Sequence, residues 1–304
     1  MPTVRNKKSE TSLKEFVVEQ DQELFAYLLS RGFKRTRAKQ LLKYRAVSVN
    51  GGPIERHDHQ LQPGDKLVLS FEKKAVPESA PKFGLQVVYE DDAVIVIDKP
   101  SGLLTIGTEK ERTKTAYFQL NEFLRGRKSE KRERIFIVHR LDRETSGLIV
   151  FAKTETAKRR LQENWNDVDK RYLAVVEGVP KEKEGTISGY LGETGTLRVY
   201  EARGPEKAKY SVTRYKVLKS SRDNALLEVE LGTGRKHQIR VHFSGLGHPV
   251  AGDKKYGAGT DPLKRLALHA HKLSFPHPLT KRLMAFESKL PHAFDVIIRR
   301  MKSS

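Results

Sequence analysis

The chain has 304 residues, contains no cysteine, and carries a formal net charge of +20 at pH 7. Without cysteine it can form no disulfide, thiolate nucleophile or cysteine-ligated zinc site, and this composition suits a reducing cytosol, so we expect a cytoplasmic protein. Because no run of about 18 apolar residues occurs and residues 1–10 are polar, we expect neither a membrane span nor a secretory signal.

Length and charge together indicate a two-domain protein with a polyanionic partner. A chain of this length exceeds one average domain, so we expect two domains and tails. Lysine and arginine displace counterions from phosphate backbones, and a strong positive charge therefore favours nucleic acid as the partner. The alternative is a protein that is merely basic and soluble. We favour nucleic acid because the basic residues cluster next to candidate sites.

The N-terminal part predicts a flexible arm followed by two helices. Residues 1–20 hold few packing residues, and we expect the arm there. Apolar residues then recur at helical spacing between positions 24 and 29, which predicts a short amphipathic helix, and Thr36 is a candidate N-cap for a second one. Seven basic residues and no acidic one lie between Arg31 and Arg45. This block is either a phosphate-tracking face or a solvated face, and we favour the former.

Two strand and turn segments follow the basic helix. Val47-Ser48-Val49-Asn50-Gly51 predicts a strand and a turn, and Pro63-Gly64-Asp65 predicts a turn before another strand. With the two helices, these segments resemble the S4 RNA-binding domain, although Thr36-Arg37 stands where Ser-Arg is common in that family. The resemblance implies an S4-like RNA-binding domain at residues 21–72. Its candidate RNA contacts are the basic side chains Lys34, Arg35, Arg37 and Lys39.

The rest of the chain predicts a larger sheet domain. A polar, proline-containing stretch at residues 73–82 is typical of a linker, and residues 83–304 form the second domain. Strand-like runs recur through it, with helical patterns near residues 117–124 and 154–167. We therefore expect an α+β protein, in which a small α/β S4-type domain precedes a mixed, largely antiparallel sheet with flanking helices.

A polar decapeptide at residues 139–148 predicts a loop that carries chemistry. It lies between two apolar, β-branched runs that predict buried strands, and loops held in this way commonly hold functional residues. Asp142 is flanked by Arg140 and Arg143, and nearby cations keep a carboxylate ionised. An ionised carboxylate can act as a nucleophile or base, or it can be part of a structural ion pair. The residue types alone leave both readings open.

The decapeptide His-Arg-Leu-Asp-Arg-Glu-Thr-Ser-Gly-Leu resembles the signature of the RluA family of RNA pseudouridine synthases. The resemblance extends over residues 83–295, and further motifs contribute to it: Asp98-Lys99-Pro100-Ser101-Gly102, Lys170-x-Tyr172-Leu173-Ala174, Gly234-Arg235-x-His237-Gln238-Ile239-Arg240, Gly252-Asp253, and Leu268-His269-Ala270. Lys236 departs from the family pattern, since Thr or Ser is more usual there.

This resemblance implies the pseudouridine synthase fold and the isomerisation of uridine to pseudouridine in RNA, with no cofactor and no metal. It assigns Asp142 as the catalytic carboxylate, Arg240 as its partner, Tyr172 as the ring that stacks on the target base, and Arg140 as the residue that fills the space of the flipped base. Whether Asp142 attacks C1′ or removes a sugar proton stays open. An S4 domain ahead of the catalytic one resembles synthases of large-subunit ribosomal RNA more than those of transfer RNA.

Three alternatives accompany this interpretation. In the first alternative the chain is a non-catalytic RNA-binding or ribosome-assembly factor. In the second it performs the same chemistry on transfer RNA, and the third is a glycosidase. A glycosidase needs a second carboxylate beside Asp142, and Glu144 is a poor candidate. His269 and His271 are weak candidates for a metal site, because no typical ligand spacing accompanies them. We expect RNA as the partner, no membrane, no protein partner, and a monomer.

Overall fold

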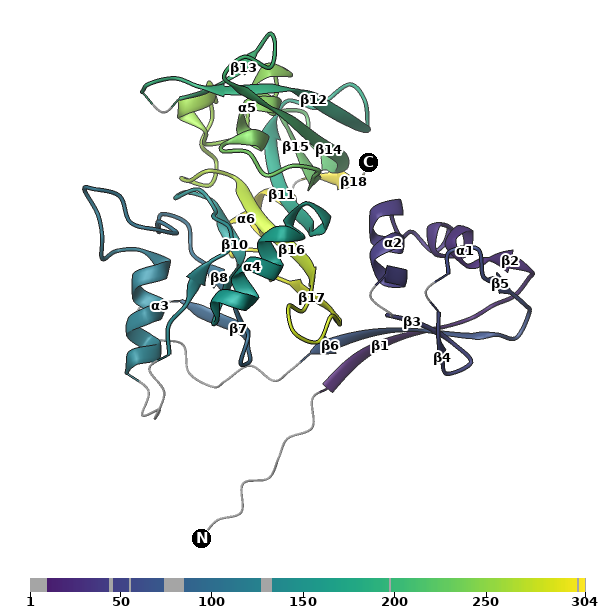
Figure 1. Ribbon diagram of the computed structural model, residues 1–304. Helices are drawn as coiled ribbons and strands as arrows, with labels where there is room; N and C mark the ends of the chain where they lie inside the picture. Colours follow the sequence, from purple (N-terminus) through teal and green to yellow (C-terminus); the bar gives the residue numbers. More distant parts are fainter. Residues whose placement is uncertain are drawn as a thin grey trace.

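The computed structural model describes residues 10–43, 46–54, 56–73, 85–126, 133–196, 198–299 and 301–303. Figure 1 shows a small N-terminal module beside a larger main body, with the long strands β1 (Glu10–Val17) and β6 (Lys66–Lys73) running from the module toward the body. In the part of the chain that the structure describes, no helix is both long and apolar enough to span a bilayer.

The N-terminal module (residues 10–73) packs two short helices on short strands. Leu28 and Leu41 are fully buried in one apolar cluster with Val47, as the helical spacing of the apolar residues predicts. The second helix begins at Arg35, and the Ala38 N–H bonds to the carbonyl of residue 34, so the prediction of Thr36 as N-cap is wrong. The remaining elements of the module are β2 (Gln22–Glu23), α1 (Leu24–Ser30), α2 (Arg35–Lys43), β3 (Val47–Val49), β4 (Gly52–Pro53) and β5 (Gln60–Leu61).

The two predicted turns of the module hold each other. Asn50 has a left-handed backbone, with φ of 50°, and its Oδ1 accepts from the Lys66 N–H at 2.9 Å. Its Nδ2 donates to Asp65 Oδ1 at 2.8 Å, while Asp65 Oδ2 accepts from the Gln62 N–H at 2.8 Å. The side chains of Asn50 and Asp65 therefore fix the end of the β3 to β6 pairing at which Val49 lies opposite Leu67.

The flexible arm predicted for residues 1–20 is wrong for Glu10–Val17, which form strand β1. This strand pairs antiparallel with β6 along its whole length, from Glu10 opposite Lys73 to Val17 opposite Lys66. Backbone pairing needs no large apolar content, so a count of packing residues misses such a strand. Residues 1–9 lie outside the described residues, as does most of the predicted linker at residues 73–82, since β6 ends at Lys73.

The main body (residues 85–303) consists of one large sheet with helices against it. Thr154 caps a helix as predicted, because its Oγ1 accepts from the Ala157 N–H at 3.1 Å. The helices are α3 (Ala116–Arg125), α4 (Glu155–Glu163), α5 (Gln238–Gly245) and α6 (His292–Ile298), with short 3-10 turns at Trp165–Asp167 and Lys254–Tyr256. The strands are β7 (Gln86–Glu90), β8 (Val94–Lys99), β9 (Phe136–Ile137), β10 (Ser146–Ala152), β11 (Asp169–Glu177), β12 (Glu184–Glu193), β13 (Val199–Ala202), β14 (Ala208–Ser220), β15 (Asn224–Leu231), β16 (Leu268–Pro276), β17 (Leu283–Glu287) and β18 (Lys302–Ser303).

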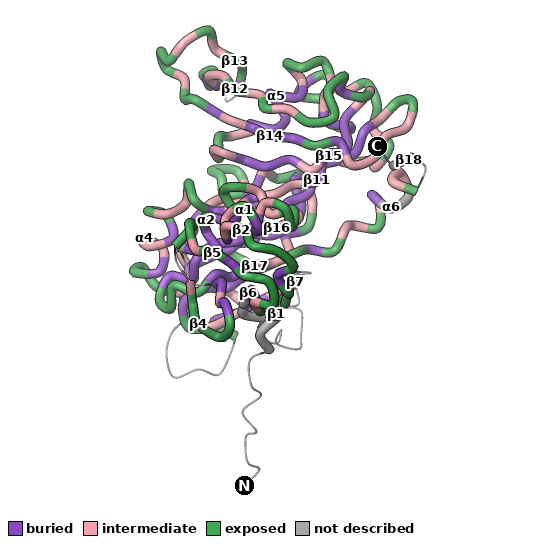
Figure 2. Tube along the Cα trace, turned by 90° about the vertical axis from the view of Figure 1, so that its right-hand side faces the viewer, coloured by how far each residue is buried: buried purple, intermediate pink, exposed green. Residues whose placement is uncertain are grey.

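The sheet is mixed and largely antiparallel, which confirms the predicted α+β class. Its strands follow the order β13-β12-β14-β15-β11-β16-β17-β6, and β10 joins it beside β16. Of the pairs formed by described strands, β10 with β16 and β17 with β6 are parallel. All residues of β10 are buried, and Figure 2 shows the buried residues along the middle of the sheet. Gly147 has φ of 111°, and a Cβ there would lie 2.2 Å from the Ala270 carbonyl oxygen, so only glycine fits.

The N-terminal module docks on the main body through apolar and charged contacts. Leu283 of β17 is buried in the module's apolar cluster, and Met284 pairs with Glu72 of β6. At the other contact, the Lys34 ammonium lies 3.0 Å from a Glu230 carboxylate oxygen and 3.9 Å from one of Glu228. The module therefore covers acidic side chains of β15.

Candidate active site

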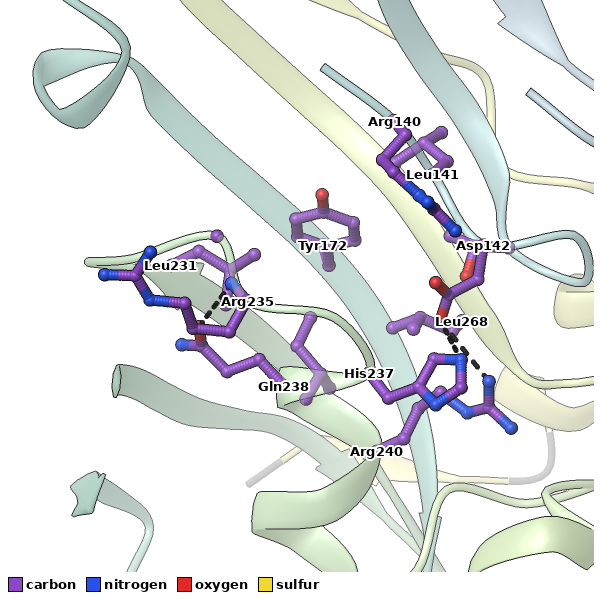
Figure 3. A pocket seen from close by; sticks show the side chains of 13 residues that line it. Arg140, Leu141, Asp142, Tyr172, Leu231, Arg235, His237, Gln238, Arg240 and Leu268 are labelled. Atoms are coloured by element: carbon purple, nitrogen blue, oxygen red, sulfur yellow. Dashed lines mark hydrogen bonds and ion pairs between the residues drawn. The ribbon is translucent and has the colours of Figure 1, made fainter. Parts of the chain in front are cut away.

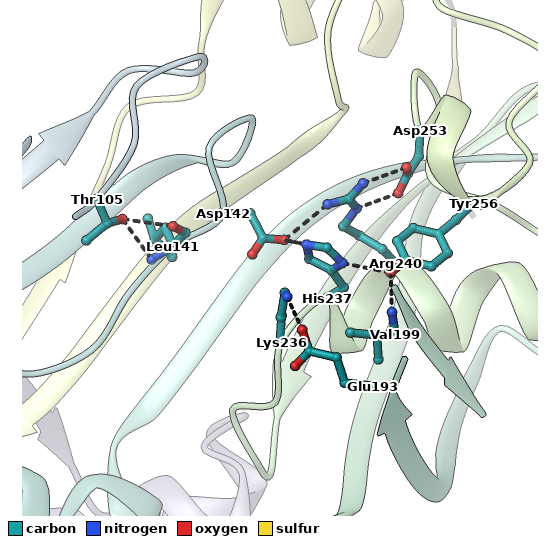
Figure 4. A network of polar contacts seen from close by, with 10 residues as sticks. All are labelled: Thr105, Leu141, Asp142, Glu193, Val199, Lys236, His237, Arg240, Asp253 and Tyr256. Carbon is teal, nitrogen blue, oxygen red and sulfur yellow. Dashed lines mark hydrogen bonds and ion pairs between the residues drawn. The ribbon is translucent and has the colours of Figure 1, made fainter. Parts of the chain in front are cut away.

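The loop that carries Asp142 is held by the segment that follows β8. Thr105 Oγ1 donates to the Leu141 carbonyl at 2.8 Å and accepts from the Leu141 N–H at 3.1 Å (Figure 4). Lys99 is fully buried, and its Nζ donates to the carbonyls of Pro100, Leu103 and Arg143 at 2.8 to 3.1 Å. Two motifs about forty residues apart in sequence are thus joined by hydrogen bonds, which hold the backbone at Leu141 and Arg143, on both sides of Asp142.

Arg240, from α5, joins Asp142 to a second carboxylate. Its Nε and Nη2 donate to the two oxygens of Asp253 at 2.6 and 2.8 Å, and its Nη1 donates to Asp142 Oδ2 at 3.3 Å (Figure 4). Burial disfavours the charge of Arg240, but the hydrogen bonds and charges of Asp253 and Asp142 outweigh it and raise the pKa of Arg240. The guanidinium is therefore a fixed cation beside Asp142, oriented from behind by Asp253.

His237 forms the other side of the Asp142 contact. Its backbone is left-handed, with φ of 53°, just before α5 begins. The Nε2 atom lies 3.8 Å from Asp142 Oδ2, and Nδ1 lies 2.7 Å from the Tyr256 hydroxyl. Burial lowers the pKa of His237 to about 4, despite the opposing charge of Asp142, so the ring is neutral at pH 7. Asp142 Oδ1 has no hydrogen bond or ion pair to any described residue, and this oxygen stays available.

Tyr172 and several apolar side chains complete a pocket next to Asp142. Figure 3 shows the Tyr172 ring between the loop of Arg140 and Asp142 on one side and Leu231 on the other. Burial and the charge of Asp142 raise the pKa of Tyr172, so its phenol stays protonated. Leu231 and Leu268 line the same pocket and are buried. A carboxylate oxygen, a fixed cation and a flat ring thus face one small space.

The predicted catalytic residues converge, and Arg140 lies with them. Asp142, Tyr172, Arg240 and Arg140 all line this pocket, and Arg140 is exposed at its mouth. Glu144 does not line it and instead lies 3.6 Å from Arg143 Nε, on the outside of the loop. The arrangement of paired carboxylates that a glycosidase needs is therefore absent from this pocket.

His237, Asp253 and Tyr256 also belong to this site, although the sequence motifs did not single them out as site residues. In the structure His237 lies just before α5, which begins at Gln238, and Arg240 is buried on that helix. All three missed residues lie inside the Gly-Arg-x-His-Gln-Ile-Arg and Gly-Asp motifs or just after them, so the signal was present. That these residues lie beside Asp142 could be seen only in the fold, because Asp142 and Arg240 are separated by 98 residues in sequence.

The four basic candidates of the N-terminal module lie on α2 or just before it, apart from this pocket. Lys34 is engaged with Glu228 and Glu230, and Arg37 is buried, which lowers its pKa to about 10. Arg35 and Lys39 are exposed and line a cavity at α2. The same basic block therefore has two kinds of members, one turned toward the main body and one toward solvent.

The histidines that suggested metal have other partners. His269 Nδ1 lies 2.9 Å from Ser146 Oγ, and His271 Nε2 lies 3.2 Å from a Glu287 oxygen. Among the described residues, no three His, Asp or Glu side chains converge as metal ligands would.

Comparisons with known proteins agree with this geometry. Residues 93–245 match the family described as RNA pseudouridylate synthase. An uncharacterised RNA pseudouridine synthase of Mycoplasma pneumoniae is 35% identical over 276 residues, which cover 86% of this chain and 86% of the relative. The uncharacterised RNA pseudouridine synthase YlyB of Bacillus subtilis is 34% identical over 279 residues, covering 90% and 91%.

Solved structures show the same likeness. The human protein named RNA Pseudouridylate Synthase Domain Containing 4 aligns with a TM-score of 0.58 and 29% identity, covering 71% of this chain and 92% of that one. The human Domain Containing 1 protein aligns with a TM-score of 0.56 and 27% identity, covering 75% and 91%.

Proposed function

This chain belongs to the family of RNA pseudouridine synthases, enzymes that isomerise uridine in RNA, and we propose that it acts on large-subunit ribosomal RNA with Asp142 as its catalytic carboxylate. The observation that carries the proposal is the free Oδ1 of Asp142, which faces a pocket while Arg240 holds the other oxygen. The proposal requires no metal, cofactor or protein partner, and it assumes a monomer that acts on RNA in the cytoplasm.

The pocket suits each step of the isomerisation. The N1–C1′ bond of the uridine breaks, the uracil turns, a C5–C1′ bond forms, and the C5 proton is replaced by a proton on N1. Asp142 either bonds to C1′ or takes the 2′ proton, and both routes need an ionised carboxylate. Arg240 stabilises that anion, and Asp253 keeps the guanidinium in place.

The detached uracil needs a surface to stay on while it turns. Tyr172 offers a flat ring at this position, and its protonated phenol keeps the ring uncharged. Leu231 and Leu268 reduce the access of water to the reacting C1′. The target base must leave its stack to enter, and Arg140 at the mouth of the pocket is placed to occupy the vacated position.

The N-terminal module is the proposed S4-like RNA-binding domain, and it supports ribosomal RNA as the target. Arg35 and Lys39 are exposed on α2 and available to phosphates. The sites of modification in structured RNA are set by the fold of the target, so a second RNA-binding surface outside the pocket favours a large, folded substrate.

Purified Asp142→Asn protein tests the assignment. The change is nearly isosteric, so it preserves packing while it removes the charge. We expect normal thermal melting and near wild-type filter binding to ribosomal RNA, with no pseudouridine detected after carbodiimide labelling. Pseudouridine formation near the wild-type rate would contradict the role of Asp142. A wild-type protein that binds ribosomal RNA tightly but modifies no cellular RNA would point to a binding factor.

A further inference from the structure

A second, basic groove adjoins the Asp142 pocket. It lies between the paired strands β12 and β13, the start of β14, and the loop before α5, and Lys207, Lys209 and Arg235 line it. Gly234 and Arg235 line both this groove and the pocket of Asp142. The two hollows are therefore neighbours along one surface, and a polymer can occupy both at once.

The groove carries positive charge that the described part of the protein does not neutralise. Its acidic member, Glu193, is engaged in an ion pair with Lys236. Lys207, Lys209 and Arg235 are exposed, and none of the three forms an ion pair with a described residue. Three cations in a hollow without compensating carboxylates favour a polyanion there.

The wall of the groove is fixed to the same framework as the active site. The Arg235 Nε donates to the Tyr210 carbonyl at 3.3 Å, and the Arg235 N–H donates to Gln238 Oε1 at 3.0 Å. Leu191 and Val199, from β12 and β13, pack with Val241 of α5 in one buried cluster. Arg235 thus stands at a set position relative to Arg240, which lies on the same helix as Gln238.

We propose that this groove binds the single-stranded RNA that flanks the target uridine, with Lys207, Lys209 and Arg235 on successive phosphates. The proposal rests on the proposed function, because the pocket fixes where the target base enters. Continuity with the pocket and charge complementarity identify the occupant as the substrate strand. Since the contacts are to the backbone, the groove contributes affinity and register with little preference for sequence.

Oligouridylates of two lengths test the groove. An oligomer of about 5 nucleotides reaches little beyond one pocket, whereas one of about 15 nucleotides extends along the surface, within the range of known single-strand sites. The test variant is Lys207→Gln with Lys209→Gln, since both side chains are exposed. The matched control is Lys181→Gln with Lys183→Gln, which removes the same charge beside the opposite end of β12, about 30 Å away.

We expect the test variant to bind the longer oligomer several-fold more weakly in fluorescence anisotropy. The salt dependence of its log affinity should be shallower by about 1.4, because each phosphate of a single strand that is no longer neutralised changes the slope by about 0.7. Binding of the shorter oligomer should not change, and the control should behave as wild type with both. Equal binding of the longer oligomer by the wild type and the test variant would overturn the proposal. Equal weakening in test and control, or an equal weakening on the shorter oligomer, would also overturn it.

Binding is measured here without any turnover, so this result is independent of pseudouridine formation. If wild-type protein makes no pseudouridine but the length-dependent weakening is found, the proposed function fails and the groove stands. If pseudouridine forms and the weakening is absent, the groove fails and the proposed function stands.

Discussion

Two parts of the molecule place a cation between two carboxylates, but only one of them leaves a carboxylate oxygen without a protein partner among the described residues. At the pocket, Arg240 is shared by Asp142 and the buried Asp253, and one oxygen of Asp142 remains open. At the contact between module and main body, Lys34 is shared by Glu228 and Glu230. Glu228 also pairs with Arg171 at 3.1 Å, so both carboxylates of this contact are engaged by protein cations.

The difference lies in what holds the cation. Arg240 makes a bidentate contact with Asp253, which fixes the plane of the guanidinium and lets it present one more N–H to Asp142. Lys34 is a point charge on a flexible stem at a half-exposed contact. The first arrangement can stabilise a reactive anion, and the second can only help two surfaces dock.

Arg240→Met should break the first arrangement completely. The change leaves Asp253 buried without its partner, and losing one partner of a buried ion pair costs about 3 to 5 kcal/mol of unfolding free energy. Activity should be lost as well. Lys34→Met, in contrast, should cost less, because the Lys34 side chain is 36% exposed and Arg214 remains 3.5 Å from the Glu230 carboxylate. Urea denaturation of both variants measures the difference, and equal destabilisation would contradict the comparison.

Tyr172→Ala should lower activity by about 5- to 150-fold, because stacking of a base on an aromatic ring is worth about 1 to 3 kcal/mol. Tyr172→Phe keeps the ring and should retain most of the activity. The measurement is pseudouridine formation at saturating RNA. Equal and complete loss in both variants would show instead that the hydroxyl transfers a proton.

Acid should destabilise the main body through its buried histidines. Burial, with a smaller effect of the charge of Lys170, lowers the pKa of His139 to about 3, and burial lowers the pKa of His242 to about 4. The pKa of histidine in an unfolded chain is about 6.5, so at pH values between about 4 and 6.5 the unfolded chain binds more protons than the folded protein. The contribution of these neutral histidines to the free energy of unfolding is fully present above about pH 6.5. It is lost as the pH falls toward 4, by at most about 1.4 kcal/mol per pH unit for each histidine.

Urea denaturation across this pH range measures the slope. His242→Gln removes one titrating group while keeping polar atoms near Ser211 and Thr213, so its slope should be shallower than that of the wild type. A wild-type unfolding free energy that is constant between about pH 6.5 and 4 would contradict the burial of neutral rings.

The smallest effect concerns the basic block of α2. Arg35→Gln with Lys39→Gln should weaken binding to ribosomal RNA and reduce its salt dependence, because both side chains are exposed. Lys34→Gln should change the salt dependence less, since its ammonium already faces Glu228 and Glu230. Filter binding at several salt concentrations measures the salt dependence for both variants. A larger change in salt dependence for Lys34→Gln than for the double variant would show that the contact of Lys34 with Glu228 and Glu230 opens when RNA binds.

These two regions also show how far sequence can reach. The motifs of the family resemblance named Asp142, Tyr172, Arg240 and Arg140, and in the structure all four line one pocket, because the fixed positions of a family signature carry tertiary information. Local chemistry likewise placed the cap at Thr154. The cap depends only on residues next to one another in the sequence, and the pocket residues were named by motifs of a known family.

The N-cap prediction at Thr36 failed locally, whereas three other failures share a cause, which is long-range pairing. Strand β1 is specified by hydrogen bonds to β6, so its own composition does not reveal it. The orientation of Lys34 depends on carboxylates of β15 almost two hundred residues away. The left-handed backbone of His237 depends on the packing of α5 and Tyr256, and no local signal distinguishes it from the first turn of a helix.

Pseudouridine mapping of total RNA from cells lacking this gene tests the central claim most directly. The cells are complemented with the wild-type chain or with Asp142→Asn, expressed at equal levels. We predict that one or a few uridines of large-subunit ribosomal RNA lose the modification on deletion, regain it with the wild type, and stay unmodified with Asp142→Asn. An unchanged map after deletion, or restoration by Asp142→Asn, would contradict the account.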